Sequence, residues 1–342
     1  MRPESGIRST DLHGVLGYML TPVKEGAANR TVNNAIDLDE SARAADALIR
    51  DGVTALCLNG TFGEVASLTW SEIETFTRTV IEAAGGRVPV FAGATTLNTR
   101  DTITRAREFR AMGAAGLMLG RPMMSPMSDV NTINFYRDVT TEVPELAIIL
   151  YDDAEAFRRP ITTRVYSELA RMRQIIGAKY RTRLLISGLV DNSFNADLEA
   201  VGENIKLLPG EFDWSVACRF YGLQACWSSL VCGGPAPVMA LRDLLAAQRW
   251  PEAESLTREI SRCYEGIIPQ NNFEVWHVDK IPFMKARFAA AGYLKPGPSL
   301  PPYQYIAPDR LEIAKECGRR SRALQQKYSA AAESAPVRNA VA

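Results

Sequence analysis

Short apolar runs rich in branched aliphatic residues alternate along the chain with longer amphipathic stretches. The runs predict strands near residues 14–20, 53–59, 88–93, 115–119, 146–151, 174–179, 205–208 and 224–228. Regular alternation of strands with helices is typical of βα units on a parallel sheet, and eight strands are the number that closes a barrel. We therefore predict an α/β fold, a (β/α)8 TIM barrel over residues 12–234.

The amphipathic stretches carry apolar residues at spacings of three and four, and Asp, Ser or Thr in their first turns. They predict helices that include 39–50, 71–84 and 99–112. Gly52, Gly85 and Gly113 follow these stretches, as expected of residues that end a helix in a left-handed conformation.

The chain continues differently after the eighth predicted strand. Helices are predicted over 235–248, 251–268, 279–291 and 308–328 without strands between them. This is more helix than one closing βα unit needs, so residues 235–328 are predicted to form a closing helix and a C-terminal helical extension. Residues 329–342 are rich in alanine and lack apolar periodicity, which predicts a disordered tail.

Composition narrows the classes of partner. Lysine plus arginine and aspartate plus glutamate both number 39, so no overall charge favours nucleic acid or an anionic membrane. Six cysteines form no Cys-X-X-Cys pair, and the two histidines stand in no ligand-spaced cluster, so no metal site is expected. Residues 1–11 are polar, and no uninterrupted apolar stretch approaches about 20 residues. We expect a cytoplasmic protein without a membrane segment.

A lysine and a tyrosine end two neighbouring predicted strands. Tyr151 ends the fifth strand, and Lys179 ends the sixth, 28 residues later. Chemistry in such barrels occurs at the carboxyl ends of the strands. Because burial disfavours a charged ammonium, a lysine there can attack a ketone as a neutral amine while the tyrosine carries protons. A lysine simply solvated at a strand end is the alternative.

The second predicted strand ends in the loop Asn59-Gly60-Thr61-Phe62-Gly63-Glu64. Gly60 and Gly63 allow a tight turn whose backbone N–H groups can hold a carboxylate, and Thr61 adds a hydroxyl. An ordinary strand-to-helix turn with a buried glutamate is an equally good interpretation of the loop taken alone.

Together, the loop from Gly60 to Glu64, Tyr151 and Lys179 resemble the dihydrodipicolinate synthase and N-acetylneuraminate lyase superfamily of pyruvate-handling class I aldolases. The resemblance implies that Lys179 forms a Schiff base and that Thr61 and Tyr151 relay protons. It implies that the loop amides hold the pyruvate carboxylate. It also implies a homotetramer, and a covalent imine in place of any metal or organic cofactor.

Two departures separate this chain from the synthases of that superfamily. Phe62 stands where the commonest motif has a second threonine, and Met123 and Met124 follow the fourth strand where synthases usually carry a tyrosine. The chain is more similar to the hydratase-aldolases of polycyclic aromatic hydrocarbon degradation, over about residues 14–328, in four further runs: Leu68-Thr69-Trp70, residues 95–100, Trp227-Ser228-Ser229 and residues 291–298. Those enzymes add water to an arylidene pyruvate and cleave the product to an aromatic aldehyde and pyruvate.

An aryl group needs apolar walls. We expect Phe62, Met123, Met124 and Trp227 to supply them beside Ser228, because methionine adapts to flat rings and apolar side chains line most ligand pockets. For the two methionines, packing in the core is an equally good interpretation.

Cations are frequent after the predicted strands, and we expect Arg158, Arg183 and Lys280 to face the substrate. Lys280 stands where related hydroxybenzylidenepyruvate enzymes carry a neutral amide. A cation suits an ortho-carboxylate, so we hypothesise trans-2′-carboxybenzalpyruvate as the substrate, giving 2-carboxybenzaldehyde and pyruvate. Ion pairs with nearby acids such as Asp152 and Asp153 are the alternative role for the arginines.

Other functions stay open at this point. A trans-o-hydroxybenzylidenepyruvate hydratase-aldolase would give salicylaldehyde and pyruvate from the same machinery. Another pyruvate-dependent aldolase of the superfamily, acting on a sugar acid or an amino-acid precursor, would need more hydroxyl groups around the distal pocket. A non-catalytic barrel that binds an oxo-acid would not require Lys179, Tyr151 and Thr61 together.

Overall fold

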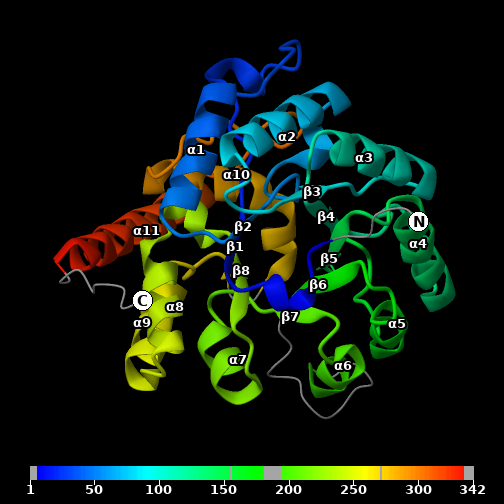
Figure 1. Cartoon of the computed structure of the whole chain (residues 1–342). Helices are drawn as coiled ribbons and strands as arrows, with labels where there is room; N and C mark the ends of the chain where they lie inside the picture. The colour runs from blue at the N-terminus through cyan, green and yellow to red at the C-terminus, as the bar shows by residue number, and fades with distance from the viewer. Residues whose placement is uncertain (1–5, 155, 181–193, 270–271, 335–342) are drawn as a thin grey trace.

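The computed structural model describes residues 6–154, 156–180, 194–269 and 272–334. Eight parallel strands form its centre (Figure 1): β1 (Gly14–Tyr18), β2 (Ala55–Cys57), β3 (Val90–Gly93), β4 (Gly116–Leu119), β5 (Ala147–Asp152), β6 (Ile175–Tyr180), β7 (Lys206–Leu208) and β8 (Ala225–Ser228). They pair in the order β7-β6-β5-β4-β3-β2-β1-β8, and a bridge between Gly210 and Trp227 joins the two ends of this series. The predicted TIM barrel is confirmed, and each strand lies within one residue of its predicted range.

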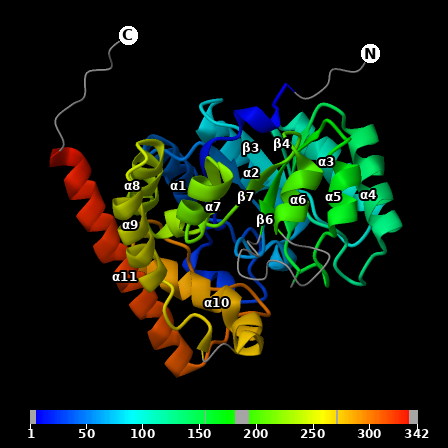
Figure 2. The same ribbon diagram turned by 90° about the horizontal axis from the view of Figure 1, so that it is seen from below.

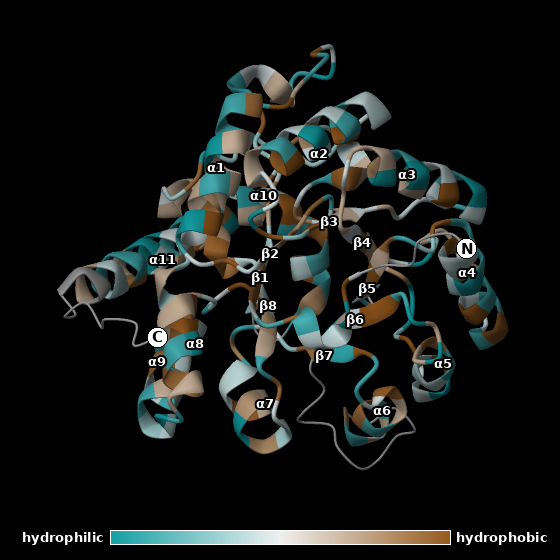
Figure 3. Cartoon of the chain, in the orientation of Figure 1, coloured by the Kyte–Doolittle hydropathy of each residue, from teal (hydrophilic) through white to brown (hydrophobic). Residues whose placement is uncertain are grey.

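Helices surround the strands, and Figure 3 shows them banded in hydrophilic and hydrophobic residues. They are α1 (Leu38–Arg50), α2 (Trp70–Ala84), α3 (Thr99–Ala111), α4 (Asp129–Glu142), α5 (Thr163–Leu169), α6 (Phe194–Val201), α7 (Trp214–Tyr221) and α8 (Ala236–Ala246). Short 3-10 turns occur at η1 (Ser9–Asp11), η2 (Glu25–Ala28), η3 (Val65–Ser67) and η4 (Leu230–Gly233). The helices begin at polar caps: Asp37, Thr69 and Asn98 each accept a hydrogen bond from an amide in the first turn.

Side chains fill the interior of the barrel. The cluster at its centre contains residues from β1 to β8, among them Leu16, Cys57, Phe91, Ile149 and Leu208. At the end of the barrel where the strands begin, Leu12 packs into this cluster, and Lys206 Nζ donates to its carbonyl at 2.7 Å. The interior is therefore a packed core, and the cavity that Lys179 lines opens toward the carboxyl ends of the strands.

Three further helices follow the barrel: α9 (Trp250–Arg262), α10 (Phe273–Ala291) and α11 (Pro308–Ser334). Figure 2 shows α8, α9 and α11 together at the side of the molecule, with α10 lying across one end of the barrel. Gly318 of α11 permits a close approach to α10, because a Cβ atom there would lie 2.2 Å from the carbonyl oxygen of Arg287. Arg310 of α11 also donates to buried Asp279 of α10 at 2.6 Å.

The ends of these helices differ from the sequence prediction. α10 begins at Phe273 instead of 279, because the Asn272 side chain accepts from the amides of Glu274 and Val275 and caps it there. α9 ends at Arg262 instead of 268. α11 continues to Ser334, so the predicted tail begins too early: residues 329–334 are helical, and 335–342 lie outside the described residues.

No helix in the described part of the chain is long and apolar enough to cross a membrane. Among the same residues, no three His, Cys, Asp or Glu side chains come together in a way that could hold a metal ion. The expected location and the expected absence of a metal stay predictions.

Candidate active site

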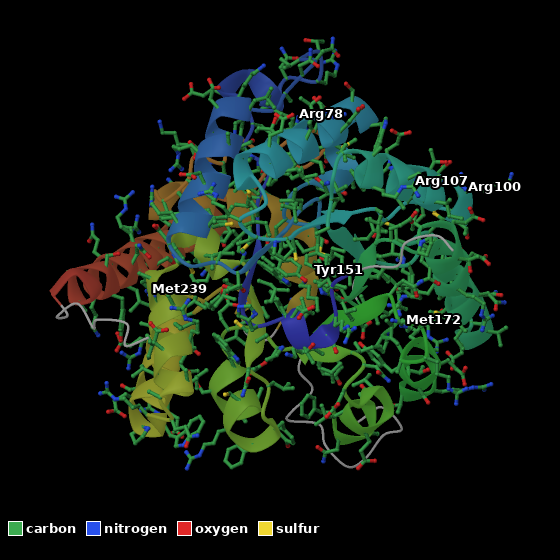
Figure 4. All side chains as sticks on the ribbon, viewed as in Figure 1. Arg78, Arg100, Arg107, Tyr151, Met172 and Met239 are labelled. Atoms are coloured by element: carbon green, nitrogen blue, oxygen red, sulfur yellow. The ribbon has the colours of Figure 1, made fainter. Side chains whose placement is uncertain are left out.

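Lys179 and Tyr151 are neighbours in the barrel, because β5 and β6 pair in a register that places them side by side. Tyr151 lies near the centre of the ring of elements, whereas Arg78, Arg100 and Arg107 extend from the outer helices (Figure 4). Lys179 is buried, and its Nζ lies 4.3 Å from the ring centre of Tyr151 and 4.3 Å from that of Trp227. The ring faces fix the position of the amine.

Thr61 joins this pair from the loop after β2. Its Oγ1 lies 2.9 Å from the Tyr151 hydroxyl oxygen, and either oxygen can be the donor. Phe157 packs edge-on against the Tyr151 ring with centroids 5.3 Å apart. The structure therefore brings Lys179, Tyr151 and Thr61 together as the sequence predicted, with two hydroxyls in line to pass a proton.

The loop from Gly60 to Glu64 is a tight turn. The amide of Gly63 donates to the Gly60 carbonyl at 3.1 Å, and that of Glu64 donates to the Thr61 carbonyl at 3.0 Å. Within the described ranges, the amides of Thr61 and Phe62 have no hydrogen-bond acceptor. Two adjacent donors beside the Thr61 hydroxyl are able to bind a carboxylate.

A buried ion pair fixes this loop. Glu64 Oε2 lies 2.8 Å from Lys285 Nζ of α10, and Glu64 Oε1 accepts from the Leu300 amide at 2.8 Å. Lys285 Nζ also donates to the carbonyls of Thr21 and Pro296. Burial lowers the pKa of Lys285, and the Glu64 carboxylate opposes that shift. Sequence reasoning anticipated a buried glutamate but missed its cation, which lies more than 200 positions away in the chain.

A cavity of about 180 Å³ opens above Lys179. Its described lining is Thr61, Phe62, Tyr151, Asp152, Asp153, Lys179, Phe212, Trp227, Ser229, Tyr264, Ile267, Ile268, Trp276, Lys280 and Met284. Phe62, Trp227 and Lys280 line it as predicted. The remaining distal residues were missed: Phe212, Tyr264, Ile267, Ile268, Trp276 and Met284. Trp276 and Met284 lie four positions before and after the predicted Lys280, which is the spacing of one helix face.

Aromatic rings meet edge to face around this cavity. Phe62 packs against Trp276 at 6.2 Å between ring centres. Phe212 packs against both Trp227, at 6.3 Å, and Tyr264, at 5.7 Å. A wall of this kind suits a flat, unsaturated ligand.

The two methionines lie elsewhere. Met124 is 69% exposed and lines a separate surface hollow beside Leu97 and Asn131. Met123 packs against the core inside the barrel and does not line the described part of the cavity. Met124 therefore lies in a separate hollow, whereas Met123 packs against the same cluster as Tyr151 without lining the described part of the cavity.

Arginines that follow β4 and β5 have partners within the protein. Arg121 is buried against Asp152 at 3.3 Å, and Arg159 pairs with Asp129 at 2.7 Å. Exposed Arg158 donates to the Met123 carbonyl and does not line the described part of the cavity. Arg183 lies outside the described residues. Of the cations predicted to face a substrate, Lys280 is the one that the structure places in the lining.

Two glycines and a serine of the predicted set shape the site without lining the described cavity. Gly60 and Gly63 form the turn that presents Thr61 and Phe62. Ser228 is fully buried at the end of β8, and its hydroxyl has no hydrogen-bond partner among the described residues. Its neighbour Ser229 lines the cavity instead.

Tyr18 and Cys57 lie beneath the amine and were not predicted as part of the site. The Tyr18 ring centre is 5.4 Å from Lys179 Nζ and 5.7 Å from that of Trp227. Burial raises the pKa of the Cys57 thiol to about 12 and that of the Tyr18 phenol well above 10. Both groups are therefore neutral near pH 7, and they support Lys179 without adding charge.

Tyr264 is held from behind by two buried charged groups. Its hydroxyl donates to Glu211, and the Arg287 guanidinium lies 4.1 Å from its ring centre. Burial raises the pKa of Tyr264 well above its ordinary value, and the charge of Glu211 adds to this. The hydroxyl is therefore a fixed donor, and the ring is a rigid part of the aromatic wall.

The chain is similar to known proteins over most of its length. A model described as the Dihydrodipicolinate synthetase family matches residues 11–274. A trans-2′-carboxybenzalpyruvate hydratase-aldolase of Nocardioides sp. (strain KP7) is 38% identical over 95% of this chain and 97% of its own length. A trans-O-hydroxybenzylidenepyruvate hydratase-aldolase of Pseudomonas putida is 37% identical over 94% and 97%.

Solved structures are also similar to this chain. A solved structure of PhdJ bound to a substrate intermediate superposes with a TM-score of 0.92 at 42% identity, covering 95% of this chain and 100% of its own. A sialic acid aldolase of Ruminococcus gnavus superposes with a TM-score of 0.76 at 16% identity, over 93% and 99% of the two chains, and shares the fold.

Proposed function

We propose that this chain, which belongs to the Dihydrodipicolinate synthetase family, is a class I hydratase-aldolase acting on an aryl-substituted oxo-acid. The family and the enzyme class predicted from the sequence agree with its relatives, which are hydratase-aldolases. One observation carries the proposal: the Lys179 amine lies over the Tyr151 ring, and the Tyr151 hydroxyl lies beside that of Thr61, in a cavity with aromatic walls.

The first step of the proposed reaction joins the substrate to Lys179. The amine attacks the ketone carbon and water leaves, so that a protonated imine forms. The amides of Thr61 and Phe62 hold the neighbouring carboxylate. The positive imine draws electrons through the conjugated double bond, which makes the carbon that bears the aryl ring accept water.

The second step breaks the carbon–carbon bond. Tyr151 removes the proton from the new hydroxyl, the aldehyde forms, and the bonding electrons return to the imine as an enamine. Protonation of that enamine and hydrolysis of the imine release pyruvate and restore the lysine. The sum is one arylidene pyruvate plus one water giving one aromatic aldehyde and one pyruvate.

The proposed substrate is trans-2′-carboxybenzalpyruvate, which yields 2-carboxybenzaldehyde. Lys280 supports this choice because a cation in the lining favours a substrate with a second carboxylate. The second candidate is trans-o-hydroxybenzylidenepyruvate, which yields salicylaldehyde, because the Pseudomonas putida relative is nearly as similar as the Nocardioides one.

Reductive trapping tests the mechanism. Pyruvate and borohydride are expected to leave a reduced adduct on the peptide that contains Lys179, detected by mass spectrometry. The variant Lys179→Met should give no adduct, while Lys315→Met, which changes an exposed lysine of α11, should be trapped like the unaltered protein. Absence of an adduct on Lys179 in the unaltered protein would reject the imine mechanism.

Side-by-side kinetics test the substrate. We expect a higher kcat/KM for the carboxylated compound than for the hydroxylated one. Lys280→Met should lower kcat/KM for the carboxylated compound by roughly 10–100-fold, since a hydrogen bond to a charged group contributes about 1.5–3 kcal/mol. Lys280→Arg should keep most of it. A preference for the hydroxylated compound, unchanged by Lys280→Met, would favour the second candidate.

We propose further that the protein is a homotetramer and that it is located in the cytoplasm. Sedimentation velocity at several protein concentrations tests the first, and fractionation of the source cells tests the second.

A further inference from the structure

The proposed reaction takes two protons from the same oxygen atom. The attacking water loses one proton when it adds to the double bond, and the resulting hydroxyl loses its second proton when the carbon–carbon bond breaks. Tyr151 is assigned to the second event. A separate acceptor for the first would let Tyr151 stay in the state that cleavage requires.

We propose that Asp153 is this acceptor: its carboxylate takes the first proton of the attacking water and is a catalytic residue for hydration alone. The inference rests on the proposed hydratase-aldolase function. It rests further on the position of Asp153, which lines the cavity together with Lys179 and Tyr151.

The other groups in the described lining are less suited to the task. Asp152 faces the helix layer, where its Oδ1 lies 3.3 Å from Arg121 and its Oδ2 accepts from Tyr166 at 3.0 Å. Tyr264 is a fixed donor to Glu211. Thr61 shares a hydrogen bond with Tyr151 and belongs to the cleavage relay.

A short turn fixes Asp153 relative to Tyr151. Asp153 Oδ1 accepts from the Ala156 amide at 3.2 Å, and the Asp153 carbonyl accepts from the Phe157 amide at 2.9 Å. The Phe157 ring then packs on Tyr151. Asp153 follows Tyr151 by two residues, which is about 7 Å along an extended chain. It therefore lies further along the strand direction than Tyr151, toward the mouth of the barrel, where the substrate carbons beyond the imine would extend.

Hydration with Asp153 as the base conserves atoms and electrons. The water oxygen forms a bond to the carbon that bears the aryl ring, and the π electrons of the double bond shift to make an enamine with the imine nitrogen. Asp153 receives the water proton. The same proton, or one exchanged with solvent, then adds to the enamine carbon, which restores the protonated imine and the carboxylate. No oxidant, reductant or further reactant is consumed.

The reverse direction separates hydration from cleavage. Pyruvate and an aldehyde first condense to a hydroxy adduct and then lose water to give the conjugated product. We would supply 2-carboxybenzaldehyde or salicylaldehyde, whichever the unaltered enzyme condenses, and follow the adduct and the conjugated product by chromatography. If the unaltered enzyme condenses neither, the proposed function fails and this inference fails with it.

Asp153→Asn keeps an acceptor for the Ala156 amide but removes the base. We expect it to form the hydroxy adduct within about threefold of the unaltered rate and to dehydrate it roughly 100-fold more slowly or worse, the usual range for loss of a general base. Asp153→Glu should recover dehydration at least about tenfold over Asp153→Asn. Asp138→Asn, an exposed aspartate of α4, is the matched control and should match the unaltered enzyme in both steps.

Two results would overturn the inference. The first is an equal loss of condensation and dehydration in Asp153→Asn while pyruvate trapping on Lys179 is intact, which is the mark of a structural role. The second is unchanged dehydration. If Asp153→Asn is not trapped with pyruvate and borohydride, Asp153→Ser replaces it. The serine variant is expected to show the same intact condensation and slow dehydration.

Discussion

Substitution of Lys285 by methionine is expected to destabilise the protein strongly, although Lys285 does not line the described cavity. The side chains of Lys285 and Glu64 are 3% and 0% exposed. Methionine fills a similar volume but leaves the Glu64 carboxylate buried without a cation. Removing one partner of a buried ion pair costs about 3–5 kcal/mol, far more than the pair contributes relative to apolar residues.

The cost of Lys285→Met is expected to fall in the upper part of that range. Lys285 Nζ also donates to the carbonyls of Thr21, at 3.2 Å, and Pro296, at 2.8 Å, and both lose this donor in the variant. Burial lowers the pKa of Lys285 and so disfavours its charge, while the Glu64 carboxylate acts in the opposite direction. The effect should also reach the active site, since Glu64 closes the loop that presents Thr61.

Urea unfolding followed by tryptophan fluorescence measures the loss, and pyruvate trapping on Lys179 measures the effect on the loop. Lys315→Met removes an exposed lysine that pairs with Glu312 at 2.7 Å and is the matched control. It should change the free energy of unfolding by less than about 0.5 kcal/mol, as surface pairs do.

The double variant Lys285→Met with Glu64→Gln gives the sharper test. The amide of glutamine carries no charge, so its burial beside methionine should be tolerated better than that of the carboxylate. We expect the double variant to be more stable than the sum of the single losses by at least about 2 kcal/mol. Additive losses, or a loss below about 1 kcal/mol in Lys285→Met, would refute the account of the ion pair.

Three further outcomes are expected. Tyr151→Phe should lower kcat by roughly 10²–10⁴-fold in steady-state assays while prolonged incubation with pyruvate and borohydride still labels Lys179. Met284→Ala should raise KM for the aryl substrate several-fold because Met284 lines the cavity, whereas Met124→Ala, in a separate hollow, should stay within about twofold. Burial raises the pKa of the Cys57 thiol from 9.0 to about 12, so between pH 9 and 12 the folded protein keeps a proton that the unfolded chain releases. The contribution of this thiol to stability is therefore present below pH 9 and is lost between pH 9 and 12. Cys57→Ala should reduce the fall in the free energy of unfolding over that range by about 1.4 kcal/mol per pH unit.

The strands were predictable because each is buried on both faces and therefore appears in the sequence as an uninterrupted apolar run. Helix starts were predictable where a capping side chain precedes them, as Asp37 and Thr69 do. α10 was placed less well. Pro282 lies inside it and usually marks the beginning of a helix, so the first two turns from Phe273 could not be separated from a loop by sequence pattern.

The floor of the site was predictable for a different reason. Thr61, Tyr151 and Lys179 stand at the ends of strands, and a parallel barrel brings all strand ends to one face, so knowing the strands was enough to bring the residues together. The distal wall does not follow this rule. Its side chains come from the segment after β7, the segment after α9, and α10, whose packing across the mouth depends on long-range contacts. Met124 shows the limit: its apolar side chain gave no indication of which side of its loop it would face.

α10 connects the two ends of the candidate pocket. Trp276, Lys280 and Met284 repeat every four residues and face the cavity, while Lys285, one position further, anchors the loop that presents Thr61. A displacement of this helix would therefore change the aryl wall and the carboxylate loop together. The predicted boundary at residue 235 divides the chain in sequence, yet it passes through the lining of a single cavity. A barrel without α10 would keep Lys179 and Tyr151 on adjacent strands but would lack both the far wall and the cation that holds Glu64. The proposed reaction therefore depends on the extension as much as on the barrel.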